Sequence, residues 1–310
     1  MRIRVVGSAA GGGYPQWNCN CVMCRAVREN QEGFTPRTQS SIAVEGTNGR
    51  WLLVNVSPDI RAQIEASPPL QPRHGVRDSG IGAILLMDSQ IDHVTGLIML
   101  RESGHPLPVY CTERVRSDLE SGFPIFRILD SYCGVDTRTV TPDRRSFTVP
   151  EVPGIRITPV PLTSAAPPYS PHRAAPDVGD NIGILIEGET GGAAFYAPGL
   201  GEADEGLDPW FRRADCLLVD GTTWTDDELS RQLGSGKRAR EMGHLPQSGP
   251  GGTIELLRRY DASRKVLIHI NNTNPILNEH SPERGALRAE GIEVAYDGME
   301  IELGGSLEHE

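Results

Sequence analysis

The fold is decided by one short stretch, Asp88-Ser89-Gln90-Ile91-Asp92-His93-Val94-Thr95-Gly96. It follows a continuous apolar run at residues 81–87, which is typical of a strand buried on both faces. We therefore interpret the stretch as a strand end, a turn and a helix. In this interpretation Asp92 and His93 lie at the helix start, and Gly96 allows close backbone packing. The alternative is that Asp92 only caps the helix and that His93 is incidental.

Three other polar residues also stand where apolar strands stop. Asp59, Asp220 and His269 each lie at or near the end of a strand-like run. Because strand ends that meet at one edge of a sheet bring distant residues together, we expect them to gather near Asp88, beside the Gly-rich loop at residues 7–13. A lone Asp at a strand end is usually only a turn or cap residue, but four such endings favour a functional site.

The rest of the chain alternates between strand-like and helix-like runs. Strands are expected at residues 2–6, 41–44, 51–56, 81–87, 155–160, 182–187, 193–196, 216–219, 265–270 and 292–296, and helices at 94–101, 251–260 and 281–290. Strands followed by a helix, twice over, predict an α/β protein with two sheets packed face to face and helices outside. The Pro-rich segment 162–180 is interpreted as an ordered loop over a pocket, with an interdomain linker as the alternative.

A second cluster consists of three cysteines in one loop, Cys19, Cys21 and Cys24, with the spacing C-x-C-x-x-C. Three thiols this close cannot all pair with one another as disulfides, but they can all face one tetrahedral zinc ion. A structural zinc is therefore expected at this loop. A disulfide with a spare thiol is the alternative; it would suit a secreted chain, and the N-terminal residues show no secretion signal.

Composition narrows the possible partners of this 310-residue chain. The formal net charge of −11 argues against nucleic acid as the main partner, because phosphate neutralisation needs a basic surface. No stretch reaches the length needed to cross a bilayer, so membrane insertion is not expected. Cysteine clusters that bind metal are typical of reducing compartments, and we expect a cytoplasmic protein.

The stretch that begins at Asp88 is similar to a known signature. Its pattern Asp-x-Gln-x-Asp-His-x-x-Gly resembles the His-x-His-x-Asp-His-x-x-Gly signature of the metallo-β-lactamase superfamily, and Asp59, Asp220 and His269 fall in the order of that family's other motif positions. The chain up to about residue 303 resembles the branch that acts in making pyrroloquinoline quinone (PQQ). This likeness is carried by Gly7-Ser8-Ala9-Ala10-Gly11-Gly12-Gly13-Tyr14-Pro15-Gln16-Trp17-Asn18-Cys19-Asn20-Cys21, Gly179-Asp180-Asn181-Ile182-Gly183 and His269-Ile270-Asn271-Asn272-Thr273-Asn274-Pro275.

The resemblance implies a four-layer αββα sandwich with the site at the sheet edge. Residues 1–303 would form a single domain, and residues 304–310 a flexible tail or a remnant of cloning. The resemblance also implies cytoplasmic work in PQQ synthesis. The substrate would be a small-molecule precursor derived from a Glu–Tyr cross-linked peptide, and the step would be oxygenation of its tyrosine-derived ring.

The chain departs from the signature at its first two histidines, which are Asp88 and Gln90 here. An amide is a poor zinc ligand, so the metal position built by those histidines is expected to be lost. Asp92, His93 and His269 remain, and two imidazoles with one carboxylate suit non-haem iron(II) with positions open for substrate and dioxygen. We therefore expect one active-site divalent metal, Fe2+.

Several roles stay open at this point. Asp220 resembles the bridging carboxylate of dinuclear members and with one metal becomes an orienting group or a proton acceptor. His244 has an equal claim to the pocket or to a turn. In relatives with a similar Cys loop, a residue shortly after the last metal-binding His completes the zinc site, which here points to Asn272 or Asn274, with water or another residue as alternatives.

Three functions are compatible with these observations. The first is an iron-dependent hydroxylase in quinone-cofactor synthesis. The second is a carrier that binds PQQ or its precursor and transports it onward, since a lost metal site can leave a binding pocket. The third is a hydrolase that works with a single zinc ion.

Overall fold

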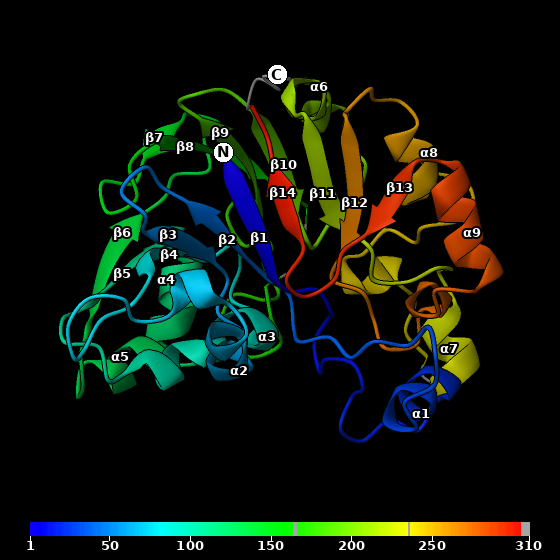
Figure 1. Ribbon diagram of the computed structural model, residues 1–310, viewed down its shortest axis with the longest axis horizontal. Coiled ribbons are helices and arrows are strands. Elements are labelled where there is room, and N and C mark those ends of the chain that lie inside the picture. Colours follow the sequence, from blue (N-terminus) through cyan, green and yellow to red (C-terminus); the bar gives the residue numbers. More distant parts are fainter. Residues whose placement is uncertain (164–165, 235, 305–310) are drawn as a thin grey trace.

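The computed structural model describes residues 1–163, 166–234 and 236–304, so the expected C-terminal tail lies outside the described residues except for Gly304. Within this part of the chain the strands form two sheets of seven strands each. The sheets pack face to face and helices cover their outer faces (Figure 1). The predicted four-layer αββα sandwich is therefore confirmed.

The first sheet has the strand order β14-β1-β2-β3-β4-β5-β6. The strands from β14 to β3 pair antiparallel, and those from β3 to β6 pair parallel. Their bounds are β1 Arg2–Gly7, β2 Ser41–Glu45, β3 Trp51–Val54, β4 Ile81–Leu85, β5 Leu107–Cys111, β6 Val135–Thr139 and β14 Glu300–Glu302.

The second sheet repeats this plan with the order β13-β12-β11-β10-β9-β8-β7. The strands from β7 to β10 pair antiparallel, and those from β10 to β13 pair parallel. Their bounds are β7 Phe147–Thr148, β8 Ile155–Pro161, β9 Ile182–Gly188, β10 Ala193–Ala197, β11 Cys216–Asp220, β12 Arg264–Ile268 and β13 Ile292–Val294.

The strands have continuous apolar sequences because both faces of each sheet are buried. On β3, Leu52 and Val54 face the core between the sheets, whereas Trp51 and Leu53 face the helices outside the first sheet. Successive side chains of a strand point to opposite faces, so a strand with two buried faces needs apolar residues at every position. The sandwich thus has three apolar layers, one between the sheets and one under each group of helices.

The helices are short and lie on the two outer faces (Figure 1). Helices α2, α4 and α5 pack on the first sheet, and α6, α8 and α9 pack on the second. In the part of the chain that the structure describes, no helix combines the length and apolarity needed for a membrane span. The helices are α1 Val22–Arg28, α2 Ile60–Glu65, η1 Pro68–Leu70, α3 Ile91–Val94, η2 Thr95–Leu100, α4 Glu113–Glu120, α5 Ile125–Leu129, η3 Glu205–Leu207, α6 Asp208–Arg213, α7 Glu228–Leu233, η4 Arg240–Met242, α8 Thr253–Leu257, η5 Pro275–Leu277 and α9 Pro282–Ala289.

The helix predicted at residues 94–101 is present, and it is mostly the 3-10 helix η2, since α3 ends at Val94. Gly96 explains the tight geometry, because a Cβ on this residue would lie 2.0 Å from the carbonyl oxygen of Ser57. The strands predicted at 51–56 and 265–270 end earlier than expected, and each is followed by a residue in the left-handed region, Asn55 with φ +62° and His269 with φ +59°. The predicted close backbone packing at Gly96 is confirmed.

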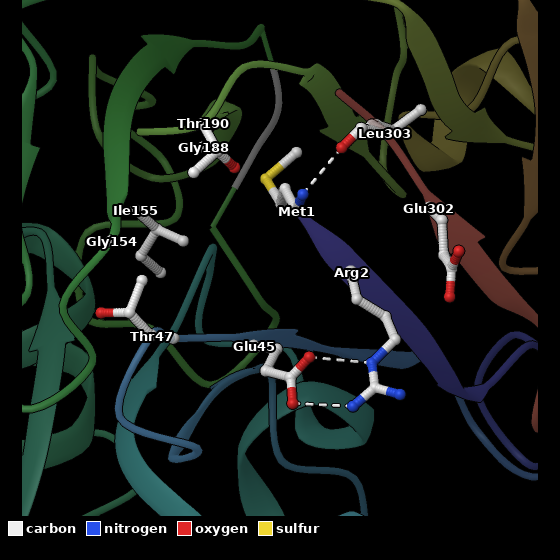
Figure 2. Close-up of a pocket in the computed structure, with 11 residues that line it drawn as sticks. Met1, Arg2, Glu45, Thr47, Gly154, Ile155, Gly188, Thr190, Glu302 and Leu303 are labelled. Atoms are coloured by element: carbon white, nitrogen blue, oxygen red, sulfur yellow. Dashed lines mark hydrogen bonds and ion pairs between the residues drawn. The ribbon is translucent and has the colours of Figure 1, made fainter. Parts of the chain in front are cut away.

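The hollows that the described residues form on this framework include the following two. The larger of these, of about 400 Å³, lies beside β1 and β14, where Arg2 forms an ion pair with Glu45 and the Met1 amino group donates to the Leu303 carbonyl (Figure 2). The described residues that line it include no histidine or cysteine. The smaller hollow lies where β4, β11 and β12 end, and two of the four strand-end residues that the sequence singles out, Asp88 and His269, line it.

Candidate metal centre

Asp92, His93 and His269 converge at the carboxyl ends of the parallel strands. Asp92 and His93 belong to α3, and His269 directly follows β12. The Oδ2 atom of Asp92 lies 3.4 Å from Nε2 of His269 and 3.7 Å from Nε2 of His93. One ligand atom from each of the three residues lies within 4.8 Å of the others. The structure therefore brings together all three residues predicted for the active-site metal.

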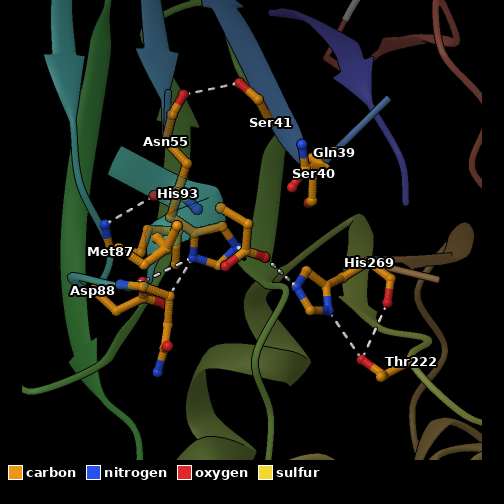
Figure 3. Close-up of polar contacts among 12 residues, drawn as sticks. Gln39, Ser40, Ser41, Asn55, Met87, Asp88, His93, Thr222 and His269 are labelled. Atoms are coloured by element: carbon orange, nitrogen blue, oxygen red, sulfur yellow. Dashed lines mark hydrogen bonds and ion pairs between the residues drawn. The ribbon is translucent and has the colours of Figure 1, made fainter. Parts of the chain in front are cut away.

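The neighbours of His93 determine which of its ring nitrogens is available. Its Nδ1–H donates to the carboxylate of Asp88, at 2.8 Å from Oδ1 and 2.9 Å from Oδ2 (Figure 3). The other nitrogen, Nε2, is buried and has no hydrogen-bond partner. A buried polar atom without a partner is costly, and a cation beside Asp92 would satisfy it. The donor set therefore fits a divalent metal ion.

The ring of His269 is oriented in the same way, by Thr222. Thr222 donates its hydroxyl hydrogen to the carbonyl oxygen of His269 and accepts a hydrogen bond from the Nδ1–H of that residue, at 3.0 Å (Figure 3). With Nδ1 bonded to Thr222, Nε2 of His269 is the ring nitrogen that faces Asp92, at 3.4 Å from Oδ2. Both imidazoles present the same nitrogen to the same point, which is the arrangement that metal-binding histidines adopt.

The charges at this point are strongly coupled. Burial lowers the pKa of His93, but attraction to Asp88 and Asp92 outweighs that effect and raises the pKa to about 9. Burial by itself raises the pKa of Asp92, but His93 and the hydrogen bond with His269 hold it well below its usual range. The carboxylate is therefore ionised at neutral pH, as a metal ligand must be.

Asp220 and His244 extend the cluster on the side of His269. Asp220 is fully buried, and its Oδ2 accepts hydrogen bonds from His244 Nδ1 at 2.5 Å and from the backbone N–H of Leu200 at 2.9 Å. The ring of His244 stacks on that of His269 with the centroids 5.2 Å apart. Of the two places that the sequence left open for His244, the structure shows the pocket.

The hollow at the site has a volume of about 240 Å³. Its walls are formed by the Gly-rich loop, by the start of α3, and by the segments that follow β10, β11 and β12. None of the described residues that line it is a lysine or an arginine. The lining residues are Ala10, Gly11, Asp88, Gln90, Asp92, Asp180, Asn181, Gly199, Thr222, Leu229, Met242, Gly243, His244, His269 and Asn271.

Asp59 does not reach this hollow, although the sequence grouped it with the other strand-end residues. Its Oδ2 accepts hydrogen bonds from the backbone N–H of Gln39 at 2.9 Å and from the Gln39 side chain at 3.0 Å. Gln39 in turn accepts the N–H of Gly12 at 2.9 Å. Asp59 therefore stabilises the Gly-rich loop through Gln39 and does not line the hollow.

The polar contacts that fasten segment 166–180 beside the site were not predicted from the sequence. Asp180 accepts a hydrogen bond from Arg114 Nε at 2.8 Å, and Asp118 accepts one from Ser89 Oγ at 2.7 Å. His172 Nε2 lies 3.4 Å from both carboxylates. Only the Pro-rich composition of the segment gave a signal, since no motif links these positions in the sequence.

The three cysteines of the N-terminal loop also converge. One sulfur atom from each of Cys19, Cys21 and Cys24 lies within 4.8 Å of the others. The Nδ2 atom of Asn272 lies 3.2 Å from Cys24 Sγ and 3.8 Å from Cys21 Sγ, so the amide donates toward the sulfurs. Of the two asparagines considered from the sequence, Asn274 lies elsewhere, because its side chain bonds to backbone atoms of residues 221, 222 and 276.

Burial and the neighbouring thiols disfavour the thiolate form of Cys24. Burial, with repulsion from Cys21 and Cys19, raises the pKa of the Cys24 thiol to about 12. A metal ion requires thiolates and replaces their protons. The loop therefore offers three ligands for a metal ion, and in the described structure the cysteines form no disulfide.

The loops that follow β11 and β12 are joined by a buried acid, Glu228 at the start of α7. Its carboxylate accepts hydrogen bonds from Trp224 N and Thr273 Oγ1, each at 2.6 Å. Burial raises the pKa of Glu228 to about 7, despite the hydrogen bonds from Thr273 and Trp224. Because this pKa is higher in the folded than in the unfolded protein, the stabilising contribution is complete below the ordinary pKa of glutamate and is lost as the pH rises through about 7.

We expect Glu228→Gln to stabilise the protein at pH 8 by up to about 3 kcal/mol and to have a much smaller effect at pH 5, since one pKa unit corresponds to about 1.4 kcal/mol. The amide keeps an acceptor for Trp224 N and carries no charge at any pH. Urea unfolding at both pH values measures the difference. Glu255→Gln, at an exposed glutamate in the first turn of α8, is the control. An equal gain in unfolding free energy at both pH values would contradict the raised pKa of Glu228.

A family model described as "Beta-lactamase superfamily domain" matches residues 50–270. Among curated proteins, coenzyme PQQ synthesis protein B of Pseudomonas paraeruginosa is 58% identical over 305 residues, which cover 98% of this chain and 100% of the relative. The protein of the same name from Methylococcus capsulatus is 57% identical, with coverage of 98% of this chain and 100% of the relative.

Solved structures show the same likeness. The crystal structure of Zn(2+)-bound PqqB from Methylobacterium extorquens superposes with a TM-score of 0.87 at 38% sequence identity and covers 98% of this chain and 100% of that chain. A diphosphatase from the PhnP family superposes with a TM-score of 0.66 at 19% identity, covering 97% of both chains, and shows the shared fold alone.

Proposed function

We propose a function for this chain on the premise that it belongs to the coenzyme PQQ synthesis protein B family, within the β-lactamase superfamily. The protein acts in the synthesis of PQQ as a metal-dependent oxygenase. It hydroxylates the tyrosine-derived ring of a small precursor that comes from a Glu–Tyr cross-linked peptide. The active-site metal is a single iron(II) ion.

One observation carries this proposal: two buried imidazoles present Nε2 to the carboxylate of Asp92 at the wall of a cavity. Two histidines and one carboxylate on one side of an ion leave the opposite positions open, and this arrangement suits non-haem iron(II). The residues that would hold the ion are Asp92, His93 and His269. A cavity of about 240 Å³ beside them offers room for part of an aromatic substrate.

The residues at the first two signature positions favour one metal over two. Asp88 is occupied by its hydrogen bonds with His93, and Gln90 carries an amide, so neither supplies the imidazole that a second zinc would need. Hydrolysis by two metals places one ion on the attacking oxygen and the other on the leaving group. With one metal, redox chemistry at open positions is better supported.

The reaction balances only with a reductant. One atom of dioxygen enters the ring in place of hydrogen, the other leaves as water, and two electrons and two protons come from a small reductant of the thiol or ascorbate class. When bound, iron(II) supplies the activation of dioxygen. The chain itself orients the imidazoles through Asp88 and Thr222, and it offers His244 Nε2 to a substrate oxygen, since Nδ1 of that ring is held by Asp220.

The Cys loop has a separate role in this proposal. Cys19, Cys21 and Cys24 hold a structural zinc ion, with Asn272 donating to the sulfurs. Closed sites rich in thiolate are typical of structural zinc, whereas two imidazoles and one carboxylate with open positions form the set used by non-haem iron(II). The zinc would fasten the N-terminal loop to the segment after β12, and so to His269.

We expect turnover to consume dioxygen. The iron-loaded protein, a reductant and a tyrosine-like diacid precursor are mixed under argon and under labelled oxygen gas, and the product mass is recorded. The ring should stay unmodified under argon and gain one labelled oxygen atom otherwise. His93→Ala gives the background.

Three outcomes would reject the oxygenase. Equal ring modification with and without oxygen would contradict the use of dioxygen. Cleavage of the precursor with an unchanged ring, and with label taken up from water, would favour a hydrolase with a single zinc, which the Zn(2+)-bound relative makes the second candidate. Tight binding of PQQ or its precursor with no chemistry under any gas would favour the carrier.

A further inference from the structure

We propose that Asp88 is a positioning residue: it leaves the metal to its neighbours and fixes the imidazole of His93 so that Nε2 faces the ion. This inference rests on the metal-dependent function proposed above. It assigns a role to a residue that stands where the superfamily signature has a histidine. The metal-binding side chain of the signature would thus be replaced by one that orients another ligand.

The hydrogen bonds of Asp88 fix its carboxylate against His93. Both carboxylate oxygens lie within 2.9 Å of Nδ1 of His93 (Figure 3). Oδ1 also accepts the backbone N–H of Gln90 at 2.9 Å. The backbone of Asp88 is held as well, by a bridge to Asn181 at the end of the second sheet. The carboxylate is therefore fixed before any ion binds.

Both residues of this contact are buried. Asp88 is 5% exposed and His93 is 2% exposed, so water does not compete for their contact. A buried carboxylate is tolerated when it accepts hydrogen bonds from partners that stabilise its charge. His93 needs such a partner, since only a ring with hydrogen on Nδ1 has a free electron pair on Nε2.

Asp88 also lies outside the groups of side chains that could hold a metal ion. At this edge of the sheets, the side-chain groups whose ligand atoms lie within 4.8 Å of one another are Asp92, His93 and His269, and Asp220, His244 and His269. Both groups consist of described residues, and Asp88 belongs to neither. It stands on the far side of the His93 ring from Asp92, since it contacts Nδ1 whereas Asp92 lies near Nε2.

The physical consequence concerns metal affinity. A carboxylate that accepts the N–H of a metal-binding histidine orients the ring and makes the metal-binding nitrogen a stronger donor. Removal of such a carboxylate typically lowers metal affinity by roughly 10- to 100-fold. Asp88 in place of the first signature histidine thus removes a ligand of one metal position and strengthens the binding of the ion that His93 holds. The chain retains one tightly held ion instead of a pair.

The test measures cobalt(II) binding under argon to full-length protein from which the active-site metal has been removed. The visible absorption of cobalt reports both affinity and coordination geometry. Asp88→Asn keeps an oxygen for the His93 N–H and loses the charge, whereas Asp88→Ala loses both. We expect affinity to fall roughly 10-fold in the first variant and roughly 100-fold in the second, with an altered cobalt spectrum in the alanine variant.

Ser89→Ala is the matched control. Ser89 is the next residue in the same turn and donates to Asp118, without a hydrogen bond to His93. It should bind cobalt as the parent protein does, and the melting temperatures of all variants show whether they are folded. Affinities within about twofold of the parent in both Asp88 variants would overturn the positioning role. If the parent and His93→Ala bind cobalt equally, the proposed metal site itself fails, which is a different result.

Discussion

Replacement of His93 or His269 by alanine should abolish turnover and remove the active-site ion. Each residue supplies one of three ligands, and the remaining two cannot hold a divalent ion against water. The loss of affinity should exceed the roughly 100-fold expected for an orienting partner, because a direct ligand is removed. Metal analysis of the purified variants, with turnover measured in parallel, gives the result.

The Cys loop provides an internal control for this experiment. Zinc bound there should remain in both histidine variants, since no ligand of that loop is changed. His105→Ala, at an exposed histidine outside the site, should retain both metals and full activity. Loss of both metals in His93→Ala would indicate general unfolding, and retention of the active-site ion would refute the ligand assignment.

Replacement of Cys24 by serine should destabilise the whole N-terminal loop. The side chain of Cys24 is fully buried and its sulfur lies next to the other two, so its loss removes a ligand from the centre of the cluster. Structural zinc contributes roughly 10–16 kcal/mol of apparent binding free energy in small domains. Loss of even about 3 kcal/mol would lower the melting temperature by roughly 5 °C in a chain of 310 residues, since the unfolding entropy is about 2.1 cal/mol/K per residue.

Thermal unfolding and zinc content of Cys24→Ser measure this effect. Cys133→Ser is the matched control, since Cys133 is a half-buried cysteine outside the loop. It should keep its zinc and melt close to the parent. An unchanged melting temperature after complete removal of zinc from the parent protein would show that the loop needs no metal for stability.

Much of the fold was predictable because its strands carry a simple pattern. Apolar runs such as residues 81–87 and 216–219 have no polar alternation, and this predicted sheets covered on both faces. The strands β5, β6, β7 and β14 were not predicted. β6 carries the sequence VDTRT with no fully buried residue, and β7 and β14 have two and three residues, so neither periodicity nor length marks them.

The site was predictable in part, for a related reason. Asp92, His93 and His269 stand at strand ends or helix starts, where topology alone brings them together. The partner of His93 was not predictable from spacing, because the contact of Asp88 with Nδ1 depends on the turn through residues 89–91. The place of His244 was equally hidden, since no pattern in residues 234–250 shows that the loop returns to Asp220.

The pairing of β1 with β14 joins the first strand of the chain to the last, with Arg2 opposite Glu302. On a ribosome, β1 therefore emerges long before β14 exists, and until then the backbone groups on the β14 side of β1 are unpaired. Asp92 likewise lacks its partner in the metal site until His269, 177 positions later, has been synthesised. Completion of this fold is thus a late event in synthesis, because an incomplete chain can neither add the last strand to the first sheet nor assemble the full set of ligands.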